Sequence, residues 1–277
     1  MSGCRITGAA LVAGIAGRPV AHSLSPVIHN AWLAAGGIDG AYVPFAPADD
    51  DGFRALVAAG RAGLVLGLNV TAPFKELAFA LADETTAAAR LTRSANILAF
   101  HDGRVRADSS DGIGLMRGLN EQAPDLDVRG RPVAVLGAGG AARAGSGALV
   151  EAGAEVRIVN RSRDRAEALA ADLGPSVRVM TAEAALDGAA LVVNALSVQP
   201  DIDLARAPDD AVAMDMTYKP LDTPFLQAAR ARGLKTVDGL SMLIGQAAPS
   251  FEALFRRPPP RLDLRALLTA HLAGTGG

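Results

Sequence analysis

The sequence predicts a two-domain α/β protein with mostly parallel strands. Apolar runs of roughly four to six residues alternate with longer stretches rich in Ala and Leu, which is the rhythm of β-α-β structure. The chain has 277 residues, a length that suits one large domain or two of ordinary size. A polar and charged stretch at 124–132 separates two such alternating series.

In the first half, the signals for helix ends are Pro and Gly. Ser25 is expected as the N-cap of a helix, with Pro26 at its first position, and the glycines at 36–37 end it. Pro73 is expected to open another helix, which carries Lys75 in its first turn. A glycine-containing turn at 101–103 predicts a hairpin between the last two strands. The expected strands are 11–15, 42–45, 64–68, 97–100 and 104–107.

In the second half, the alternation becomes tighter and more regular. We expect helices at 112–121, 141–152, 164–173 and 223–232, and a helical last stretch from Ser241 on, interrupted by the prolines at 258–260. The expected strands are 133–136, 156–159, 177–180, 191–193, 212–214 and 236–237.

The composition excludes several classes of function. The formal net charge is −2, so the chain has no overall attraction for nucleic acid or a membrane surface. The sequence has no uninterrupted run of about 18 apolar residues, so we expect no membrane-spanning helix. Cys4 is the only cysteine, which rules out an intramolecular disulfide and a multi-cysteine metal site. We expect a cytoplasmic protein, monomeric or homodimeric, that uses no metal.

Lysine is rare in this chain. Lys75, Lys219 and Lys235 are the only lysines among 27 basic residues, and all the others are arginines. Because the chain prefers arginine where a plain positive charge suffices, a lysine indicates a site that needs an amine.

A glycine turn follows the apolar strand at 133–136. The segment Gly137, Ala138, Gly139, Gly140 and Ala141 fits the pattern G-x-G-x-x-A, which continues to Ala142, and it opens a helix. Glycine lets the backbone turn sharply and approach a pyrophosphate, and the helix N-terminus offers free N–H groups to that anion. The alternative is an ordinary turn, but the strand and helix around it favour a Rossmann-type dinucleotide site.

The end of the next strand indicates which dinucleotide binds. NAD sites usually have Asp or Glu there, whereas this strand ends in Asn160, Arg161 and Ser162, followed by Arg163 and Arg165. A carboxylate repels a 2′-phosphate, and a guanidinium binds it with charge-assisted hydrogen bonds. We therefore predict NADP, with Ser162 also capping the helix; the alternative is a helix start with solvated arginines.

Two polar clusters in the first half are candidate substrate sites. Ser23 and Ser25 place two hydroxyls at a helix start, where they can bind a carboxylate, or act only as a cap and a turn serine. Asn69 and Thr71 follow an apolar strand and face the same way, and Lys75 comes one turn later. An amine can donate a proton where an arginine cannot, although a solvated lysine is the alternative.

A third cluster comprises Asn96 and the segment 108–112. A carboxylate near Lys75 would orient the amine and favour its charged form, and Asp111 is the candidate. Asp111 can also cap the helix that follows, and the two roles can coexist.

We place domain boundaries near Asp111 and Asp238. Residues 112–238 are expected to form a Rossmann-like NADP-binding domain. Residues 1–111 together with 239–277 are expected to form a discontinuous substrate-binding and catalytic domain, in which the last helices pack back on the first.

Taken in order, the motifs resemble those of the shikimate dehydrogenase family over nearly the whole chain. The most specific is Asn-Val-Thr-x-Pro-Phe-Lys. The motifs are Ser23-x-Ser25-Pro26, Asn69 to Lys75, Asn96, Asp108-x-x-Asp111-Gly112, the glycine turn from Gly137, Asn160-Arg161-Ser162, Tyr218-x-Pro220 and Asp238 to Gln246.

The resemblance implies reversible reduction of 3-dehydroshikimate to shikimate with NADPH, with the substrate in a cleft between two α/β domains. It implies Lys75 and Asp111 as the catalytic pair, and Ser23 and Ser25, with Tyr218 nearby, as ligands of the substrate carboxylate. It places ring hydroxyls at Asn69, Thr71, Lys75, Asn96, Asp111 and Gln246. It places the cofactor at Gly137, Ala138, Gly139, Gly140, Ala141, Asn160, Arg161, Ser162, Arg165, Ala195, Leu196, Met216, Gly239 and Met242.

The chain departs from the usual family pattern at a few positions. Ile97 replaces a threonine, Ser109 and Ser110 replace Asn-Thr, the loop from Leu196 to Gln199 replaces a Thr-Ser-x-Gly type, and Ser241 replaces a glycine. These changes bear on substrate choice and cofactor affinity before they bear on chemistry. The alternatives are a relative that acts on quinate or a related cyclohexene acid, a non-catalytic ligand-binding relative, and a folate-linked NADP dehydrogenase, against which the serine and lysine motifs argue.

Overall fold

The computed structural model describes residues 6–196 and 198–274, so Cys4 and Ser197 lie outside the described residues. The chain divides into two compact units. The N-terminal unit runs to Ser110 and resumes at Ala247, and the central unit is Asp111–Gln246.

The second boundary between the units lies inside helix α10 (Gly239–Phe255), between Gln246 and Ala247. The sequence places a domain boundary at Gly239 instead, and that position stays a prediction. The contacts explain the difference, because the first half of α10 packs on α5 (Asp111–Gln122) within the central unit.

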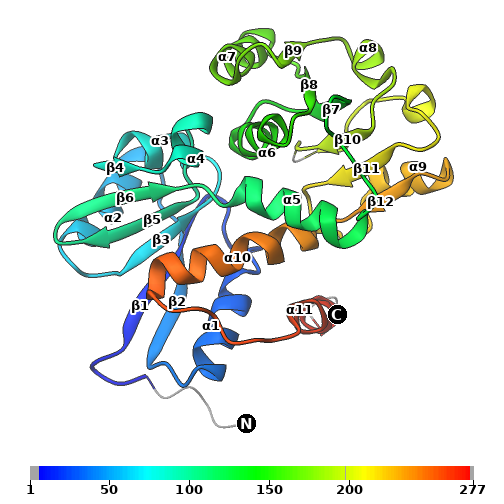
Figure 1. Cartoon of the computed structure of the whole chain (residues 1–277). Helices are drawn as coiled ribbons and strands as arrows, with labels where there is room; N and C mark the ends of the chain where they lie inside the picture. The colour runs from blue at the N-terminus through cyan, green and yellow to red at the C-terminus, as the bar shows by residue number, and fades with distance from the viewer. Residues whose placement is uncertain (1–5, 197, 275–277) are drawn as a thin grey trace. The chain divides into compact units, whose positions relative to one another are not determined.

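The N-terminal unit is built on a mixed six-stranded sheet in the order β2-β1-β3-β5-β6-β4 (Figure 1). β1 runs parallel to β2 and β3, whereas β5 runs antiparallel to β3 and β6. The expected hairpin is confirmed, with Asp102 and Gly103 at positive φ in its turn. The strands are β1 (Leu11–Ala16), β2 (Gly40–Phe45), β3 (Gly67–Val70), β4 (Glu84–Thr85), β5 (Ile97–His101) and β6 (Arg104–Asp108).

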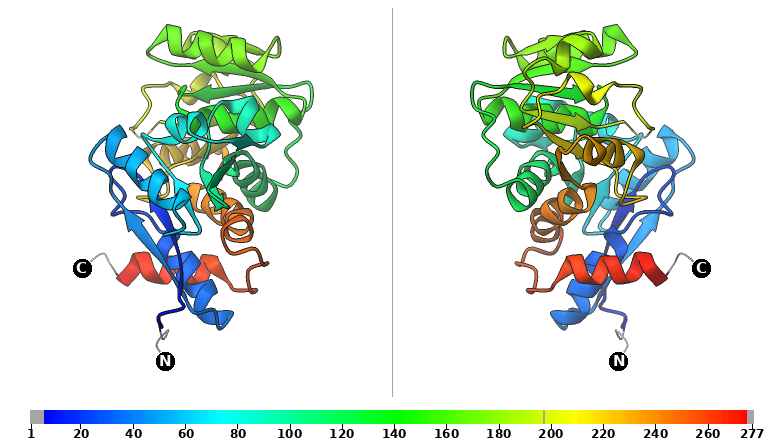
Figure 2. Two further views of the ribbon diagram at one scale, coloured as in Figure 1. Left: turned by 90° about the vertical axis from the view of Figure 1, so that its left-hand side faces the viewer. Right: turned by 90° about the vertical axis from the view of Figure 1, so that its right-hand side faces the viewer.

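Helices cover this sheet. α2 (Asp50–Arg61) and α3 (Lys75–Ala80) contribute to one core cluster with the strands. An aromatic group forms a second cluster, in which Trp32 of α1 (Ser25–Ala35) and Phe255 each pack against Phe251 of α10. α11 (Leu264–Gly274) runs beside α1 (Figure 2), and α4 (Ala87–Thr92) packs against β6.

Helix α2 was not expected from the sequence. Asp49 caps it by accepting a hydrogen bond from the Gly52 N–H at 2.9 Å, and its buried positions are Phe53, Val57 and Gly60. That spacing is the one-sided pattern of an amphipathic helix, so the signal was present in the chain.

Three local expectations are wrong. The strand expected at 64–68 lies at Gly67–Val70, because Gly63 ends the turn after α2 with φ +84° and leaves Leu64 exposed. Ser25 is the first residue of α1 rather than its N-cap, a position that Leu24 occupies. Pro73 lies in the turn before α3 and does not open the helix, which begins at Lys75.

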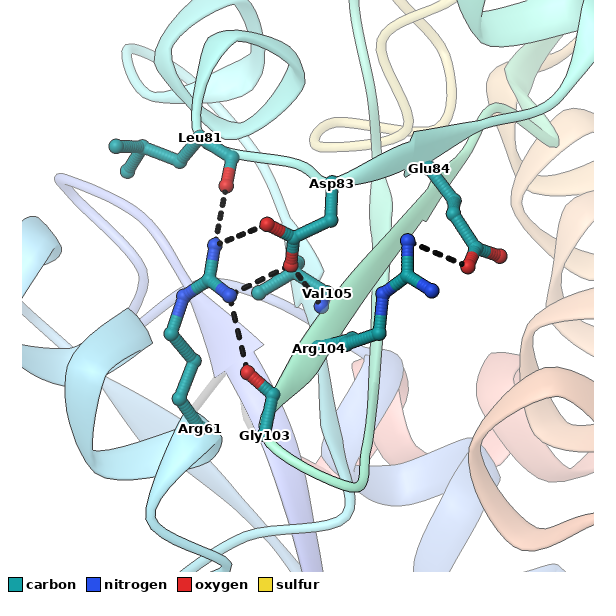
Figure 3. A network of polar contacts seen from close by, with 7 residues as sticks. All are labelled: Arg61, Leu81, Asp83, Glu84, Gly103, Arg104 and Val105. Carbon is teal, nitrogen blue, oxygen red and sulfur yellow. Dashed lines mark hydrogen bonds and ion pairs between the residues drawn. The ribbon is translucent and has the colours of Figure 1, made fainter.

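A polar network ties the end of α2 to the hairpin and to β4 (Figure 3). Arg61 forms an ion pair with Asp83 at 2.6 Å and also donates to the carbonyls of Leu81 and Gly103. The Val105 N–H donates to the same carboxylate at 2.7 Å. The Arg61 hydrogen bond first, and then the Val105 N–H, lower the pKa of Asp83. The network fixes the segment before β4 and the turn between β5 and β6, at the β4 edge of this sheet.

The central unit has a six-stranded, fully parallel sheet in the order β12-β11-β10-β7-β8-β9. This is the order of doubly wound dinucleotide-binding domains, with the crossover between β7 and β10. All six strands were expected. They are β7 (Pro132–Leu136), β8 (Glu155–Val159), β9 (Val177–Val179), β10 (Leu191–Asn194), β11 (Val212–Asp215) and β12 (Lys235–Val237).

Helices lie on both faces of this sheet (Figure 1). α8 (Ala182–Leu186), the short 3-10 helix η1 (Leu204–Arg206) and α9 (Pro224–Ala231) form one buried core with the strands. α6 (Gly140–Glu151) and α7 (Arg163–Leu173) lie on the other face. The short α8 was not expected from the sequence.

Glycines let α5 and α10 approach closely. A Cβ at Gly114 would lie 2.5 Å from the Met242 carbonyl oxygen, and one at Gly118 would lie 3.2 Å from the Met242 nitrogen. Pro249 removes one hydrogen-bond donor inside α10, and the carbonyl four residues earlier, at Gly245, accepts from Arg117 of α5 at 2.9 Å instead. This contact holds the first half of α10 against α5.

Candidate active site

In the N-terminal unit, the expected substrate residues Asn69 and Asn96 lie side by side. Asn69 is the third of the four buried residues of β3, and its Nδ2 donates to the Asn96 carbonyl at 3.0 Å. The Val70 N–H donates to the same carbonyl at 2.8 Å. The pairing of β3 with β5 therefore brings together two residues that are far apart in sequence.

Asn96 is held by the segment after β6. Its Oδ1 accepts from the Ser110 N–H at 2.8 Å, and its Nδ2 donates to the Ser110 hydroxyl at 3.1 Å. Ser110 is 1% exposed. Ser110 replaces the threonine of the family pattern, and it keeps the hydroxyl that fixes the Asn96 amide.

The serine pair lies at the start of α1. The Ser25 N–H donates to the Ser23 hydroxyl at 3.3 Å, which fixes the two residues relative to each other. Ser25 is 7% exposed, and its side chain forms a hydrogen bond with Tyr42. The pair is thus linked to the neighbouring strand β2.

Thr71 directly follows β3, and Lys75 comes after the turn at 72–74. The Thr71 N–H donates to the Ala16 carbonyl at 2.9 Å, and the Phe74 N–H donates to the Thr71 carbonyl at 3.1 Å. Gly17 makes room, because a Cβ there would lie 2.2 Å from the Thr71 Cγ2. Lys75 begins α3, and its carbonyl accepts from the Ala95 N–H next to Asn96.

Sequence reasoning missed the side chains that support Asn69. The Tyr42 hydroxyl donates to the Asn69 Oδ1 at 2.7 Å, and the Asn69 Nδ2 also donates to the Ser250 hydroxyl. Tyr42 is fully buried, and burial raises the pKa of its hydroxyl well above the usual value, so it acts as a neutral hydrogen-bonding group. Tyr42 could have been suspected because it is one of the chain's two tyrosines and lies on an expected strand. Nothing in the sequence around Ser250 indicates a role in the site.

His29 packs under this cluster. Its ring stacks on Tyr42 with centroids 4.2 Å apart, and it is 1% exposed. Burial lowers its pKa to about 3, so it is neutral at physiological pH. His29 therefore stacks on Tyr42 as a neutral, planar ring.

In the central unit, the glycine turn has the geometry that a pyrophosphate needs. Gly137 has φ +119°, a conformation that favours glycine. Gly139 is the N-cap of α6, which has no side-chain cap, and a Cβ on Gly139 would meet nothing within 4 Å. Open space therefore lies beside Gly139 at the N-terminus of α6, next to the buried Ala138 and ahead of Gly140 and Ala141, and the site fits an anion.

The end of β8 fits the 2′-phosphate of NADP. Arg163 is paired with Glu167 at 2.6 Å, whereas Arg161 and Arg165 are exposed and form no ion pair with any described residue. The Asn160 Nδ2 donates to the Ser162 carbonyl at 2.8 Å and shapes the turn. Ser162 is the N-cap of α7 as expected, but its side chain makes no capping hydrogen bond.

The residues expected near the nicotinamide gather at the carboxyl ends of β10 and β11. A Cβ on Gly137 would lie 3.3 Å from the Leu196 Cδ2 and 3.4 Å from the Ala195 carbonyl oxygen. Gly239 lies against the Met216 carbonyl, which would be 2.6 Å from its Cβ. Met242 is on the next turn of α10.

The other expected site residues also belong to the central unit. Asp111 begins α5, Tyr218 lies in the loop after β11, and Gln246 is the last residue of α10 within this unit. Ser241 stands where the family pattern has a glycine, and its contacts show what the serine adds. Its hydroxyl accepts from the Gln122 Nε2, which also donates to Asp238 at 2.9 Å. A glycine at 241 could not make this contact with α5.

In residues 6–196 and 198–274, no three His, Cys, Asp or Glu side chains are grouped so as to hold a metal ion. None of the helices described is long and apolar enough to cross a membrane.

The fold and the two groups of residues define a dinucleotide-dependent oxidoreductase with a separate substrate-binding unit. The family model described as the shikimate dehydrogenase substrate binding domain matches residues 15–98. The model described as NADP oxidoreductase, coenzyme F420-dependent, matches residues 132–211.

Relatives and solved structures agree with this class. The shikimate dehydrogenase (NADP+) of Caulobacter vibrioides is 50% identical over 275 residues, covering 95% of this chain and 96% of the relative. The crystal structure of shikimate 5-dehydrogenase from Thermus thermophilus in complex with NADP(H) and shikimate is 33% identical, with a TM-score of 0.84, and the match covers 95% of this chain and 99% of that one. Quinate dehydrogenase from Corynebacterium glutamicum in complex with NAD is 26% identical, with a TM-score of 0.84, over 95% and 99% of the two chains.

The chain therefore belongs to the shikimate dehydrogenase family. It is an enzyme, and its cofactor is NADP.

Proposed function

We propose that this enzyme reduces 3-dehydroshikimate to shikimate with NADPH, reversibly, in the cytoplasm. The observation that carries the proposal is the cluster of Ser25, Asn69 and Asn96 in the N-terminal unit. Hydroxyl and amide groups fixed in one place suit a small acid that carries several hydroxyls. The Thermus thermophilus relative, solved with shikimate and NADP(H), supports the same substrate class.

Each binding residue has a role that follows from its chemistry. Ser23 and Ser25 bind the substrate carboxylate through their hydroxyls at the start of α1, with Tyr218 nearby. The amides and hydroxyls of the remaining residues bind the ring hydroxyls and orient the ring. These residues are Asn69, Thr71, Asn96, Asp111 and Gln246.

Lys75 and Asp111 are the proposed catalytic pair. When bound, NADPH supplies a hydride to the substrate carbonyl carbon. Negative charge then develops on the carbonyl oxygen, and the Lys75 Nζ, as an ammonium group, stabilises it and gives up a proton to it. Asp111 is the carboxylate that we assign to orient this amine. In the reverse direction, Lys75 accepts the proton from the hydroxyl.

Substitutions of Lys75 test this proposal. Lys75→Ala lowers kcat by roughly 10²–10⁴ if proton transfer dominates, measured by NADPH absorbance with shikimate and NADP. Lys75→Arg keeps the positive charge but cannot release the proton, so it is also poor. Turnover close to that of the parent enzyme in either variant, with an unchanged circular dichroism spectrum, contradicts the assignment.

Quinate is the second candidate substrate. The similarity of this chain to the quinate dehydrogenase of Corynebacterium glutamicum favours it, because one fold serves both acids. That relative was solved with NAD, however, whereas this chain has Asn160 and Arg161 directly after β8, where NAD sites usually have Asp or Glu. We therefore rank shikimate with NADP first.

A further inference from the structure

Two neighbouring strands of the central unit end in buried polar side chains that no proposed chemical step uses. Asn194 ends β10, Asp215 ends β11, and the two residues are paired in the parallel register. They are 2% and 1% exposed. A carboxylate this deeply buried is tolerated only where donors surround it.

Three donors converge on the Asp215 carboxylate. The Thr223 hydroxyl donates to Oδ2 at 2.7 Å, and the Asn194 Nδ2 donates to the same oxygen at 3.1 Å. The Thr217 N–H donates to Oδ1 at 2.8 Å. One side chain thus fixes the strand end of β10, the loop after β11 and the start of α9.

The network continues into the loop after β10. The Asn194 Oδ1 accepts from the Leu196 N–H at 3.1 Å, and the Thr217 hydroxyl donates to the Leu196 carbonyl at 3.4 Å. Both polar groups of the Leu196 backbone are therefore held by residues that are themselves bound to Asp215. This loop is one of the places where the chain departs from its family pattern.

The loop after β10 borders the glycine turn, and the loop after β11 borders the start of α10. The Leu196 side chain and the Ala195 carbonyl lie against Gly137, and the Met216 and Thr217 carbonyls lie against Gly239. In an open parallel sheet, ligands bind outside the carboxyl ends of the strands. The loops therefore line the part of the cofactor site beyond the pyrophosphate, where the nicotinamide ribose and ring are expected.

We propose that Asp215 is a positioning residue that sets the nicotinamide end of the cofactor site through Asn194 and the backbones of Leu196 and Thr217. The proposal rests on the NADP assignment but not on the identity of the acid substrate. Asp215 does not touch the adenosine end, which lies at the carboxyl end of β8. It therefore affects one end of the cofactor and leaves the other unchanged, which a general loss of folding would not do.

The test compares two ligands by isothermal titration calorimetry. One is NADPH, and the other is 2′-phospho-ADP-ribose, which has the same adenosine and pyrophosphate parts but lacks the nicotinamide. Asp215→Asn keeps the shape of the side chain but turns one acceptor into a donor. We expect the Kd for NADPH to rise about tenfold or more, the loss expected when a buried hydrogen bond is broken, and the Kd for 2′-phospho-ADP-ribose to stay within about twofold.

Thr223→Val is a second and milder variant, with a matched control in the same unit. Thr223 caps α9 by accepting from the Leu226 N–H and also donates to Asp215. Thr181 caps α8 in the same way, through the Ala184 N–H, but has no bond to Asp215. Thr223→Val should weaken NADPH selectively and Thr181→Val should not, although both lose a cap.

The outcomes separate the explanations. Equal weakening of both ligands, or of neither, in Asp215→Asn and Thr223→Val overturns the positioning role. If Asp215→Asn does not fold, Thr223→Val decides the question alone, because it leaves the carboxylate and two donors in place. If the parent protein itself binds NADPH no better than NADH, the assignment of NADP as cofactor fails. That result is distinct from a failure of the positioning role, which is seen only in the variants.

Discussion

Tyr42→Phe removes a single oxygen atom from the centre of the substrate cluster. The ring stays stacked on His29, with centroids 4.2 Å apart, so the apolar burial is unchanged. What is lost is the donor to the Asn69 Oδ1 at 2.7 Å, together with the contact with Ser25. Leaving a buried acceptor without its donor costs about 1–3 kcal/mol, and we expect the free energy of unfolding to fall by that amount.

Urea unfolding followed by fluorescence measures this loss directly. Trp32 is the only tryptophan, and it packs on Phe251 in the same cluster, with ring centroids 5.2 Å apart. A double-mutant cycle with Asn69→Ala isolates the contact, because Tyr42→Phe should cost much less when the amide is already absent. An equal cost in both backgrounds would refute the claim that Tyr42 acts through Asn69.

Three further predictions each concern a single residue. Arg161→Asp should weaken NADP binding roughly 10–150-fold, the contribution of a charged hydrogen bond, and leave NAD much less affected; an equal effect on both cofactors would contradict the 2′-phosphate role. Gly114→Ala places a Cβ 2.5 Å from the Met242 carbonyl oxygen, so it should destabilise the protein to urea by about 1–3 kcal/mol, and an unchanged midpoint would show that α5 and α10 can separate freely. The pKa of His29 is about 3 in the folded protein and 6.5 when unfolded, so the unfolded state binds the proton first and stability should fall, by at most about 5 kcal/mol, as the pH drops from 6.5 toward 3. His29→Gln should flatten this pH dependence in the same denaturation assay, and parallel profiles would rule out His29 as its source.

The sequence predicted the central unit better than the N-terminal one. Each strand of the central unit is a short apolar run between helices, so all six were found, and the glycine turn indicated where to expect the cofactor. In the N-terminal unit, the apolar run from Leu64 gave no indication that its first residues form a connection, and β3 was placed three residues too early. Periodicity finds an apolar strand but cannot locate its first hydrogen bond.

The candidate site shows a similar limit. Residue types with clear chemistry, such as Lys75 and Asn69, could be identified from the chain alone. The groups that orient them could not, because the contacts cross long stretches of sequence: Ser250 reaches Asn69 across a separation of 181 residues. Gln122 and Ser241 show the same effect, since the departure at 241 was visible but its partner on α5 was not.

The most direct test of the account is a panel of shikimate and quinate, each assayed for oxidation with NADP and with NAD. We expect that shikimate with NADP gives the highest kcat/KM, that quinate is a poor substrate, and that Lys75→Ala removes the activity with shikimate. A higher kcat/KM with quinate, or equal activity with NAD and NADP, would contradict it.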